Sequence, residues 1–197
     1  MRNFILGIVM CLAAFNVNAS VITFDDVITS SFQALGDDYH GFDWNNSGIN
    51  IGAVNYNYDP GRYQHGTVSG VMSAFNYGGS SPVYVDLIAG GAFDFNGVYM
   101  AGTVSPQYVT FEGWNDGVQL YTSSSILLSY TATQWIELNW AGIDRLVINN
   151  CCTHWSMDNF TYQISSVPIP SAVWFFGSGL IGLIGIARRK EASLYKR

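Results

Sequence analysis

Apolar and polar residues alternate with a period of two along most of the chain, in short runs that end at glycine, proline, asparagine or aspartate. A two-residue period places alternate side chains on opposite faces of a β-strand, so the pattern predicts half-buried strands. The runs that show it are 20–27, 66–77, 81–95, 108–124, 125–142, 143–150 and 155–164. Their spacing predicts seven or eight strands in two packed antiparallel sheets, a jelly-roll β-sandwich in preference to an immunoglobulin-like one.

Two stretches carry turn signals. Asn115, Asp116 and Gly117 separate two alternating runs, and Gly117 can adopt the positive φ of a tight turn, which predicts a β-hairpin. Residues 36–66 are rich in glycine, asparagine, aspartate and aromatic residues and are expected to form long loops that carry a hairpin. No segment between the two ends has apolar residues at helical spacing over three turns, so the fold class is expected to be all-β.

The N-terminal segment has the features of a targeting sequence. A positive charge precedes an apolar stretch from Phe4 to Phe15, and a small residue, Ala19, stands just before Ser20. Residues 1–19 are therefore predicted to be a cleaved signal peptide. The alternative is a retained anchor, which would need a longer apolar core.

The C-terminal segment, residues 166–190, has the composition of a short membrane helix, which leaves 20–165 as the exported domain. Residues 172–187 carry no charge and would span ~24 Å as a helix, against ~30 Å for the hydrocarbon core of a bilayer. Trp174 is expected at the outer boundary. Three cations should hold the other end in the cytoplasm: Arg188, Arg189 and Lys190.

One face of this predicted helix carries small residues. Gly182 and Gly185 follow Ser178 at helical spacing, which would allow a partner helix to approach closely. The alternative is that glycine is simply tolerated in a membrane segment.

The exported domain is strongly acidic. Between Ser20 and Val167 the cationic residues are Arg62 and Arg145, against eleven Asp and two Glu, a net formal charge of -11. Such a domain repels phosphate backbones, so nucleic acid is excluded as an expected partner.

Export would leave two cysteines, the adjacent Cys151 and Cys152. Neighbouring Cα atoms lie ~3.8 Å apart, below the usual disulfide span of ~4.4 to 6.8 Å, so a vicinal disulfide would be a strained ring that an oxidising compartment still permits. The alternatives are two thiols without a role or a bond to another chain. A metal site with His154 is disfavoured, because zinc sites usually have four ligands at wider spacing.

Aromatic residues gather beside carboxylates in the loop-rich stretch 36–66. Loops of a sandwich commonly carry binding groups, and aromatic faces stack on sugars while carboxylates accept hydrogen bonds from hydroxyls. The candidate glycan-binding residues are Trp44, Tyr56, Tyr58 and Tyr63. The alternative is that these side chains pack in the core.

Enzymatic function is less favoured. Glu112 with Asp116, and Glu137 with Asp144, are carboxylate pairs of the kind a glycosidase uses, but the sequence does not set their separation. The chain has no G-x-S-x-G and no H-E-x-x-H motif. We therefore expect a non-enzymatic protein, with a glycan-active enzyme as the alternative.

Several motifs resemble the jelly-roll domains of exported bacterial proteins, which are similar to carbohydrate-binding and galactose-binding-like modules. They are ITFDDV, GAFDFNGVYM, VTFEGWNDGVQLY, WAGIDRLVI and MDNFTY. The resemblance implies a sandwich fold and a structural calcium where the first and last strands meet, held by Asp25 or Asp26 and by Asp158. The alternative is a solvated turn at Asp25 and Asp26 and a loop cap at Asp158.

The tail is similar to the PEP-CTERM sorting signal, a proline motif followed by an apolar helix and a basic end. Val167, Pro168, Ile169 and Pro170 match the motif, with Ile169 where the family has glutamate. The resemblance implies a substrate of exosortase, a membrane-embedded protease that cuts near the prolines. It also implies export across the inner membrane to the cell surface or extracellular matrix, with polysaccharide as a candidate partner. An unprocessed single-pass inner-membrane protein is the alternative.

Overall fold

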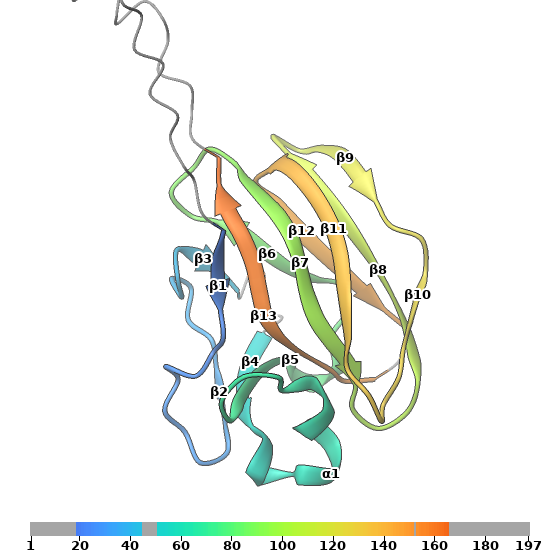
Figure 1. Cartoon of the computed structure of the whole chain (residues 1–197). Coiled ribbons are helices and arrows are strands. Elements are labelled where there is room, and N and C mark those ends of the chain that lie inside the picture. The colour runs from blue at the N-terminus through green and yellow to red at the C-terminus, as the bar shows by residue number, and fades with distance from the viewer. Residues whose placement is uncertain (1–18, 45–50, 152, 166–197) are drawn as a thin grey trace, which may run out of the picture. The chain divides into compact units, whose positions relative to one another are not determined.

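The computed structural model describes residues 19–44, 51–151 and 153–165, which form a sandwich of two antiparallel β-sheets (Figure 1). The seven-stranded sheet contains, in hydrogen-bonded order, β11 (Gln134–Ile143), β7 (Phe93–Gly102), β13 (Trp155–Ile164), β5 (Met72–Asn76), β4 (Ile51–Asn55) and β2 (Phe32–Ala34), and β1 (Ser20–Ile22) pairs with β13. The six-stranded sheet contains β10 (Ile126–Leu128), β8 (Gln107–Asn115), β12 (Arg145–Asn150), β6 (Val83–Leu87) and β3 (Phe42–Asp43), and β9 (Val118–Thr122) pairs with β8.

The predicted all-β antiparallel sandwich is confirmed, although it has more strands than the sequence predicts. Two alternating runs each supply strands to both sheets. The run 81–95 is interrupted at Gly90 and Gly91, which have φ of 71° and 85°, so that β6 joins the six-stranded sheet and β7 the seven-stranded one. The run 125–142 divides in the same way into β10 and β11.

Short helical turns precede and follow β5 of the seven-stranded sheet. Between β4 and β5 the chain forms η2 (Tyr56–Tyr58), α1 (Pro60–Tyr63) and η3 (Gln64–Gly66), and η4 (Tyr77–Gly79) follows β5. Pro60 stands at the first position of α1, where its missing N–H costs no hydrogen bond. The stretch 36–66, expected to be loops, therefore contains short strands and helical turns as well.

Aromatic rings fill the space between the sheets. The ring of Phe42 packs edge-on against Phe93, Phe160 and Tyr162, with centroids between 4.8 and 5.8 Å apart. Such pairs add about 0.5–1.5 kcal/mol each beyond their burial. The largest fully buried side chains are Trp44, Trp155, Phe24, Phe42, Phe93, Phe95, Phe111 and Phe160.

The predicted hairpin is confirmed. Asn115 pairs with Val118 across the β8–β9 ladder, and the two residues between them, Asp116 and Gly117, have φ of 49° and 76°. Positive φ at both central positions is the geometry of a type I′ turn, which matches the twist of the flanking strands.

Asp158 of β13 holds the loop that leads into β5. Its side chain is fully buried, and its Oδ2 accepts hydrogen bonds from the backbone N–H groups of Val68 and Ser69, both at 2.8 Å. The Ser69 hydroxyl also donates to it, at 3.0 Å. The carboxylate thus joins two segments that are 90 residues apart in the sequence.

Asp25 holds the next part of the same loop. Its Oδ1 accepts from the backbone N–H groups of Val71 at 2.9 Å and Met72 at 3.1 Å. Gly70 has a φ of 48°, and a Cβ there would lie 2.0 Å from that carboxylate oxygen. Only glycine leaves room for the contact.

The three carboxylates proposed as calcium ligands have hydrogen-bond partners within the protein. Asp25 and Asp158 face backbone N–H groups, and Asp26 accepts from the Tyr39 hydroxyl and lies 2.9 Å from Nε2 of His40. Within the described part of the chain, no group of three or more His, Cys, Asp or Glu side chains could hold a metal ion. For Asp158 the geometry matches the loop-cap alternative, and the calcium site gains no support.

Several predicted features lie outside the described residues. They are residues 1–18 of the signal peptide, Cys152, the motif Val167, Pro168, Ile169 and Pro170, and the helix and basic end with Trp174, Gly182, Gly185, Arg188, Arg189 and Lys190. These features stay predictions. Within the described ranges, no helix is long and apolar enough to cross a membrane.

Replacing Asp158 with alanine is expected to lower the free energy of unfolding by about 1–3 kcal/mol, because the amides of Val68 and Ser69 lose their acceptor. Asp158→Asn keeps one acceptor oxygen and should cost less. Urea unfolding of both variants and the wild type gives the comparison, and equal stability of all three would refute the role given to Asp158.

The pH dependence of that contribution has a definite sign. Burial raises the pKa of Asp158 to about 6, against the opposing effect of its backbone hydrogen bonds. Between about pH 4 and 6 the folded protein keeps a proton on Asp158 that the unfolded chain has released. The stabilisation that comes from this bound proton is therefore complete below pH 4 and is lost as the pH rises through 6. The stability difference between wild type and Asp158→Asn should therefore change across this window, as measured by urea unfolding at pH 4, 5, 6 and 7.

Candidate functional site

The outer face of the six-stranded sheet is lined by aromatic and polar residues from β6, β12 and β8. Alternate residues of these strands, such as Val83, Val85, Phe111, Leu146 and Ile148, are buried in the core. Because successive side chains of a strand point to opposite faces, the residues between them face outward. The outward set is Tyr84, Asp86, Glu112, Trp114, Arg145, Val147 and Asn149.

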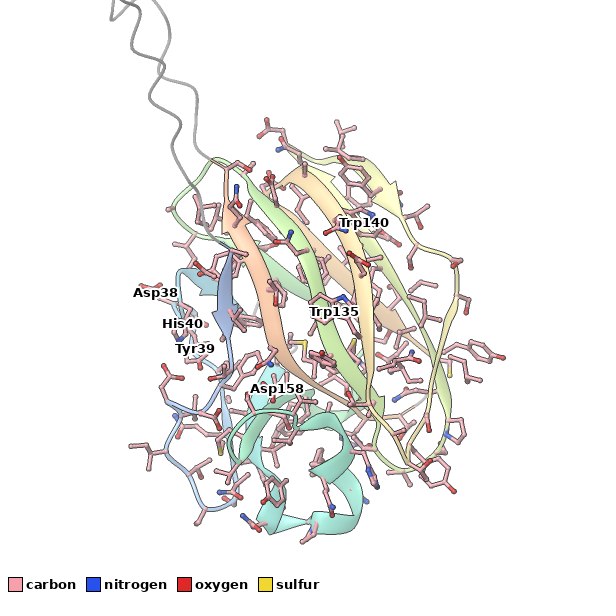
Figure 2. All side chains as sticks on the ribbon, in the orientation of Figure 1. Asp38, Tyr39, His40, Trp135, Trp140 and Asp158 are labelled. Carbon is pink, nitrogen blue, oxygen red and sulfur yellow. The ribbon has the colours of Figure 1, made fainter. Side chains whose placement is uncertain are left out.

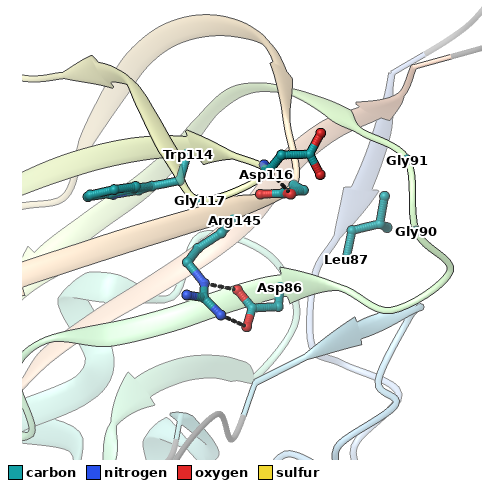
Figure 3. A pocket seen from close by; sticks show the side chains of 9 residues that line it. Asp86, Leu87, Gly90, Gly91, Trp114, Asp116, Gly117 and Arg145 are labelled. Atoms are coloured by element: carbon teal, nitrogen blue, oxygen red, sulfur yellow. Dashed lines mark hydrogen bonds and ion pairs between the residues drawn. The ribbon is translucent and has the colours of Figure 1, made fainter.

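The strand register arranges these residues in two rows across the three strands: Asp86, Arg145 and Trp114 in one, and Tyr84, Val147 and Glu112 in the other. Two adjoining cavities of about 360 and 390 Å³ lie along the rows and share Trp114, Gly117 and Arg145. We call this surface the groove. Figure 3 shows the end that contains Asp86 and Arg145.

Trp114 is held in a fixed orientation within the groove. Its indole N–H donates to Oε2 of Glu112 at 2.9 Å, and Oε1 of Glu112 accepts from the side-chain amide of Asn149 at 3.1 Å. Gly117 lines both cavities beside the ring. An aromatic face set in place before a ligand arrives loses little conformational entropy on binding.

Arg145 is held from both sides. Its Nε and Nη2 donate to the two oxygens of Asp86 at 2.6 and 2.8 Å (Figure 3). Its guanidinium carbon lies 5.3 Å from the centre of the Tyr84 ring. The hydrogen bond to Asp86 raises the pKa of Arg145. The paired charges give the groove one donor group and one acceptor group at fixed positions.

Carboxylates outnumber cations in the groove. Arg145 lies among Asp86, Asp116 and Asp144 in one cavity and beside Glu112 in the other. Asp144 is itself engaged, because its Oδ2 accepts from the backbone N–H of Asp116 at 2.8 Å. The groove therefore offers many acceptors for hydroxyl groups and carries a net negative charge.

A third cavity extends the groove beyond Asn149. It has a volume of about 260 Å³, and Tyr108, Ser125, Asn149 and Cys151 are among its lining residues. The Tyr108 side chain is 54% exposed. Trp114, Tyr84 and Tyr108 thus place aromatic rings along one continuous surface.

Of the carboxylate pairs weighed for catalysis, Glu112 and Asp116 line adjoining cavities of the groove, whereas Asp144 lines the groove and Glu137 lies on the other sheet. Glu112 lies in the groove and accepts from Trp114 and Asn149, as described above. Glu137 lies on β11, in the other sheet, and accepts from the side-chain amide of Asn139 at 2.9 Å.

The four aromatics predicted to bind glycan do not lie in the groove. Trp44 is fully buried, with its indole N–H donating to the Tyr39 carbonyl at 2.8 Å, and is a core residue. Tyr56 is partly buried against a small apolar cluster. Tyr58, 55% exposed, and Tyr63, 5% exposed, line a separate pocket.

Of the two cysteines predicted to form a vicinal disulfide, the structure describes one. Cys151 is exposed at the edge of the third cavity, and Cys152 lies outside the described residues. The vicinal disulfide stays a prediction.

Sequence reasoning missed the groove because its residues come from distant segments. Tyr84, Glu112 and Val147 occupy one row although they are separated by 28 and 35 positions. The available signal is the alternation itself, which is clear in β6, where Tyr84 stands between the buried Val83 and Val85. In β12 the outward Val147 is itself apolar and buried, so the alternation is absent there. Even where it is clear, the alternation gives the outward face of a strand but not which strands are neighbours.

No protein-family model matches the chain, and no curated protein matches it. Among solved structures, it is similar to the CBM22-1 xylan-binding domain of Paenibacillus barcinonensis Xyn10C, at 11% identity and a TM-score of 0.45, covering 79% of this chain and 99% of that one. It is also similar to the C-terminal family 22 carbohydrate-binding module of Clostridium thermocellum Xyn10B, at 13% identity and a TM-score of 0.40, covering 76% of this chain and 94% of that one.

A third similar structure is an apo cyclase from Fischerella sp., at 14% identity and a TM-score of 0.40, covering 75% of this chain and 97% of that one. By their descriptions, the first two structures are binding modules and the third is an enzyme.

Proposed function

We propose that the domain binds a neutral polysaccharide chain in the groove without cleaving it. The observation that carries this proposal is the Trp114 indole, fixed by Glu112 on an outward sheet face. The face of such a ring packs on the C–H face of a sugar, while the surrounding side chains exchange hydrogen bonds with its hydroxyls. Three adjoining cavities in a row fit an extended chain better than a single small molecule.

The charge of the groove favours a neutral ligand over an acidic one. The carboxylates of Asp86, Glu112, Asp116 and Asp144 face one guanidinium, that of Arg145. The domain as a whole has the same sign, with a net formal charge of -11. A polyuronate or sulfated glycan would be repelled, and the repulsion would weaken with added salt.

Trp114→Ala is expected to weaken binding to neutral polysaccharide at least about tenfold in Kd, equivalent to about 1.4 kcal/mol. The matched control is Trp135→Ala, because Trp135 is also a partly exposed tryptophan (39%) but lies on β11 of the other sheet (Figure 2). Affinity electrophoresis and calorimetry with soluble xylan, mixed-linkage β-glucan and galactomannan provide the measurement.

If Trp135→Ala abolished binding while Trp114→Ala did not, the groove would not be the site. Release of reducing ends from any of these polymers by the wild-type protein would favour the enzyme alternative.

Charge selection is tested with polygalacturonate and a neutral polysaccharide of similar length. The neutral polymer should bind more tightly at 20 mM salt, and the gap should narrow at 500 mM salt because screening shortens the range of the repulsion. Tighter binding of polygalacturonate at low salt would contradict the assignment of a neutral ligand.

We also propose that the chain reaches the cell surface through its C-terminal segment, as a substrate of an exosortase-type protease. The support is the order of Val167–Pro170 motif, apolar stretch and basic end in the sequence. An exported binding module carried to the cell surface would contact extracellular polysaccharide there.

Neutral replacement of Arg188, Arg189 and Lys190 is expected to impair insertion and processing, because these cations hold the cytoplasmic end. The matched control replaces Lys196 and Arg197, which lie beyond the motif. Fractionation and intact mass of the surface form in the native host give the readout. Normal display and processing of the triple variant would count against the sorting proposal.

A further inference from the structure

A second pocket lies at the opposite sheet, where β2 and β5 meet the helical turns η2, α1 and η4. It has a volume of about 350 Å³, and it has no lining residue in common with the three cavities of the groove. Two of the aromatics that the sequence predicts for glycan binding, Tyr58 and Tyr63, belong to it. We call it the aromatic pocket.

Three of its rings are exposed, although one of them, Phe32, contacts the other two. Phe32, Tyr58 and Tyr77 are 38%, 55% and 42% exposed. The Phe32 ring lies 5.7 Å from that of Tyr58 and 5.5 Å from that of Tyr77, centre to centre. Apolar rings that gather at an opening, rather than closing over it, leave faces on which a ligand can pack.

Buried rings form the floor. Phe75 and Tyr63, 4% and 5% exposed, lie with their centres 5.3 Å apart, and Phe75 is 6.2 Å from Phe32. Phe75 belongs to β5 and Tyr63 to α1, so the floor is built on regular structure and the pocket is formed before a ligand arrives.

Polar groups of both kinds stand beside the rings. Nε of Arg62 is 3.4 Å from Oδ2 of Asp59, and both side chains are more than 40% exposed. His154 lines the pocket from the segment just before β13, and burial together with the charge of Arg62 lowers its pKa. A guanidinium donor, a carboxylate acceptor and an imidazole therefore face the same space, with their charges nearly balanced.

These features match the two sides of a sugar ring. Its C–H face is apolar and packs on aromatic rings, and its neighbouring hydroxyls both donate and accept hydrogen bonds, which suits an adjacent carboxylate and guanidinium. A purely apolar ligand would make no use of the paired Asp59 and Arg62 side chains, and an anion would meet the Asp59 carboxylate.

We infer that the aromatic pocket is a second glycan site, which takes one neutral sugar ring at a chain end or side branch, and that the domain bridges two polysaccharide chains through this pocket and the groove. The bridging rests on the proposed function of the groove, whereas the pocket's own binding does not. Two weak sites on one domain can together hold a polymer network far more tightly than either alone.

The test compares the wild type, Trp114→Ala, the pocket variant Tyr58→Ala with Arg62→Gln, and all three changes combined. Tyr58 and Arg62 are exposed, so the fold should tolerate their replacement. Tyr130→Ala is the matched control, since Tyr130 is 43% exposed and lies outside both sites. Thermal unfolding checks that each variant is folded.

Two measurements separate the sites. Saturation-transfer NMR with methyl glycosides of xylose, glucose, mannose and galactose reports the pocket, and calorimetry with the polymer that binds best to the wild type reports the groove. Light scattering of protein and polymer mixtures reports bridging.

We expect Trp114→Ala to keep the single-sugar signal, and the pocket variant to lose that signal at least about tenfold while it retains polymer binding. Each should lose the scattering increase of the wild type, and Tyr130→Ala should lose nothing.

Loss of the single-sugar signal in Trp114→Ala alone, or its persistence in the pocket variant, would overturn the pocket proposal and leave the groove proposal standing. Loss of polymer binding in the pocket variant, with none in Trp114→Ala, would refute the groove and the bridging but keep the pocket as a glycan site. No binding of any sugar by the wild type would refute both.

Discussion

The pleat of the β-strands is the constraint on which the molecule depends. A strand turns only every second side chain to one face, so the aromatic core of the sandwich fixes what the outer faces present. In β8, burial of Val109 and Phe111 leaves Glu112 and Trp114 outward, and the antiparallel register then sets Arg145 directly opposite Trp114. A one-residue slip would exchange core and surface in that strand. Packing in the interior therefore maintains the geometry of the groove, although no groove residue named here belongs to the main core.

Features that depend on neighbouring residues were predictable, and features that depend on long-range pairing were not. The turn at Asp116 and Gly117 follows from local conformational preference, and the all-β class follows from the period of the alternation. Asp158 was predictable as a polar residue of the last strand, but its partner Val68 lies 90 residues earlier. Trp44 stands among loop residues, and only the tertiary fold shows that its ring enters the core. The resemblance to jelly-roll modules supplied the architecture without supplying the site.

The distribution of charge gives the two surfaces a common chemistry. Arg62 and Arg145 each line a cavity, and each is paired with a nearby carboxylate, Asp59 and Asp86 respectively. Such a pair presents N–H donors and oxygen acceptors together while adding little net charge. In a domain that is otherwise acidic, this arrangement allows hydrogen bonding to a polar neutral molecule and disfavours polyanions. Because cations are so few, we expect neither surface to bind nucleic acid.

The pairing of β1 with β13 brings the first and last strands of the domain side by side, with Ser20 opposite Tyr162. The chain therefore enters and leaves at one pole of the sandwich (Figure 1). His154, at the other end of β13, stands about 30 Å away along a strand of ten residues. Were the sandwich tethered next to Ser20 or Ser165, the aromatic pocket would lie at the opposite pole, about the length of one strand from that end.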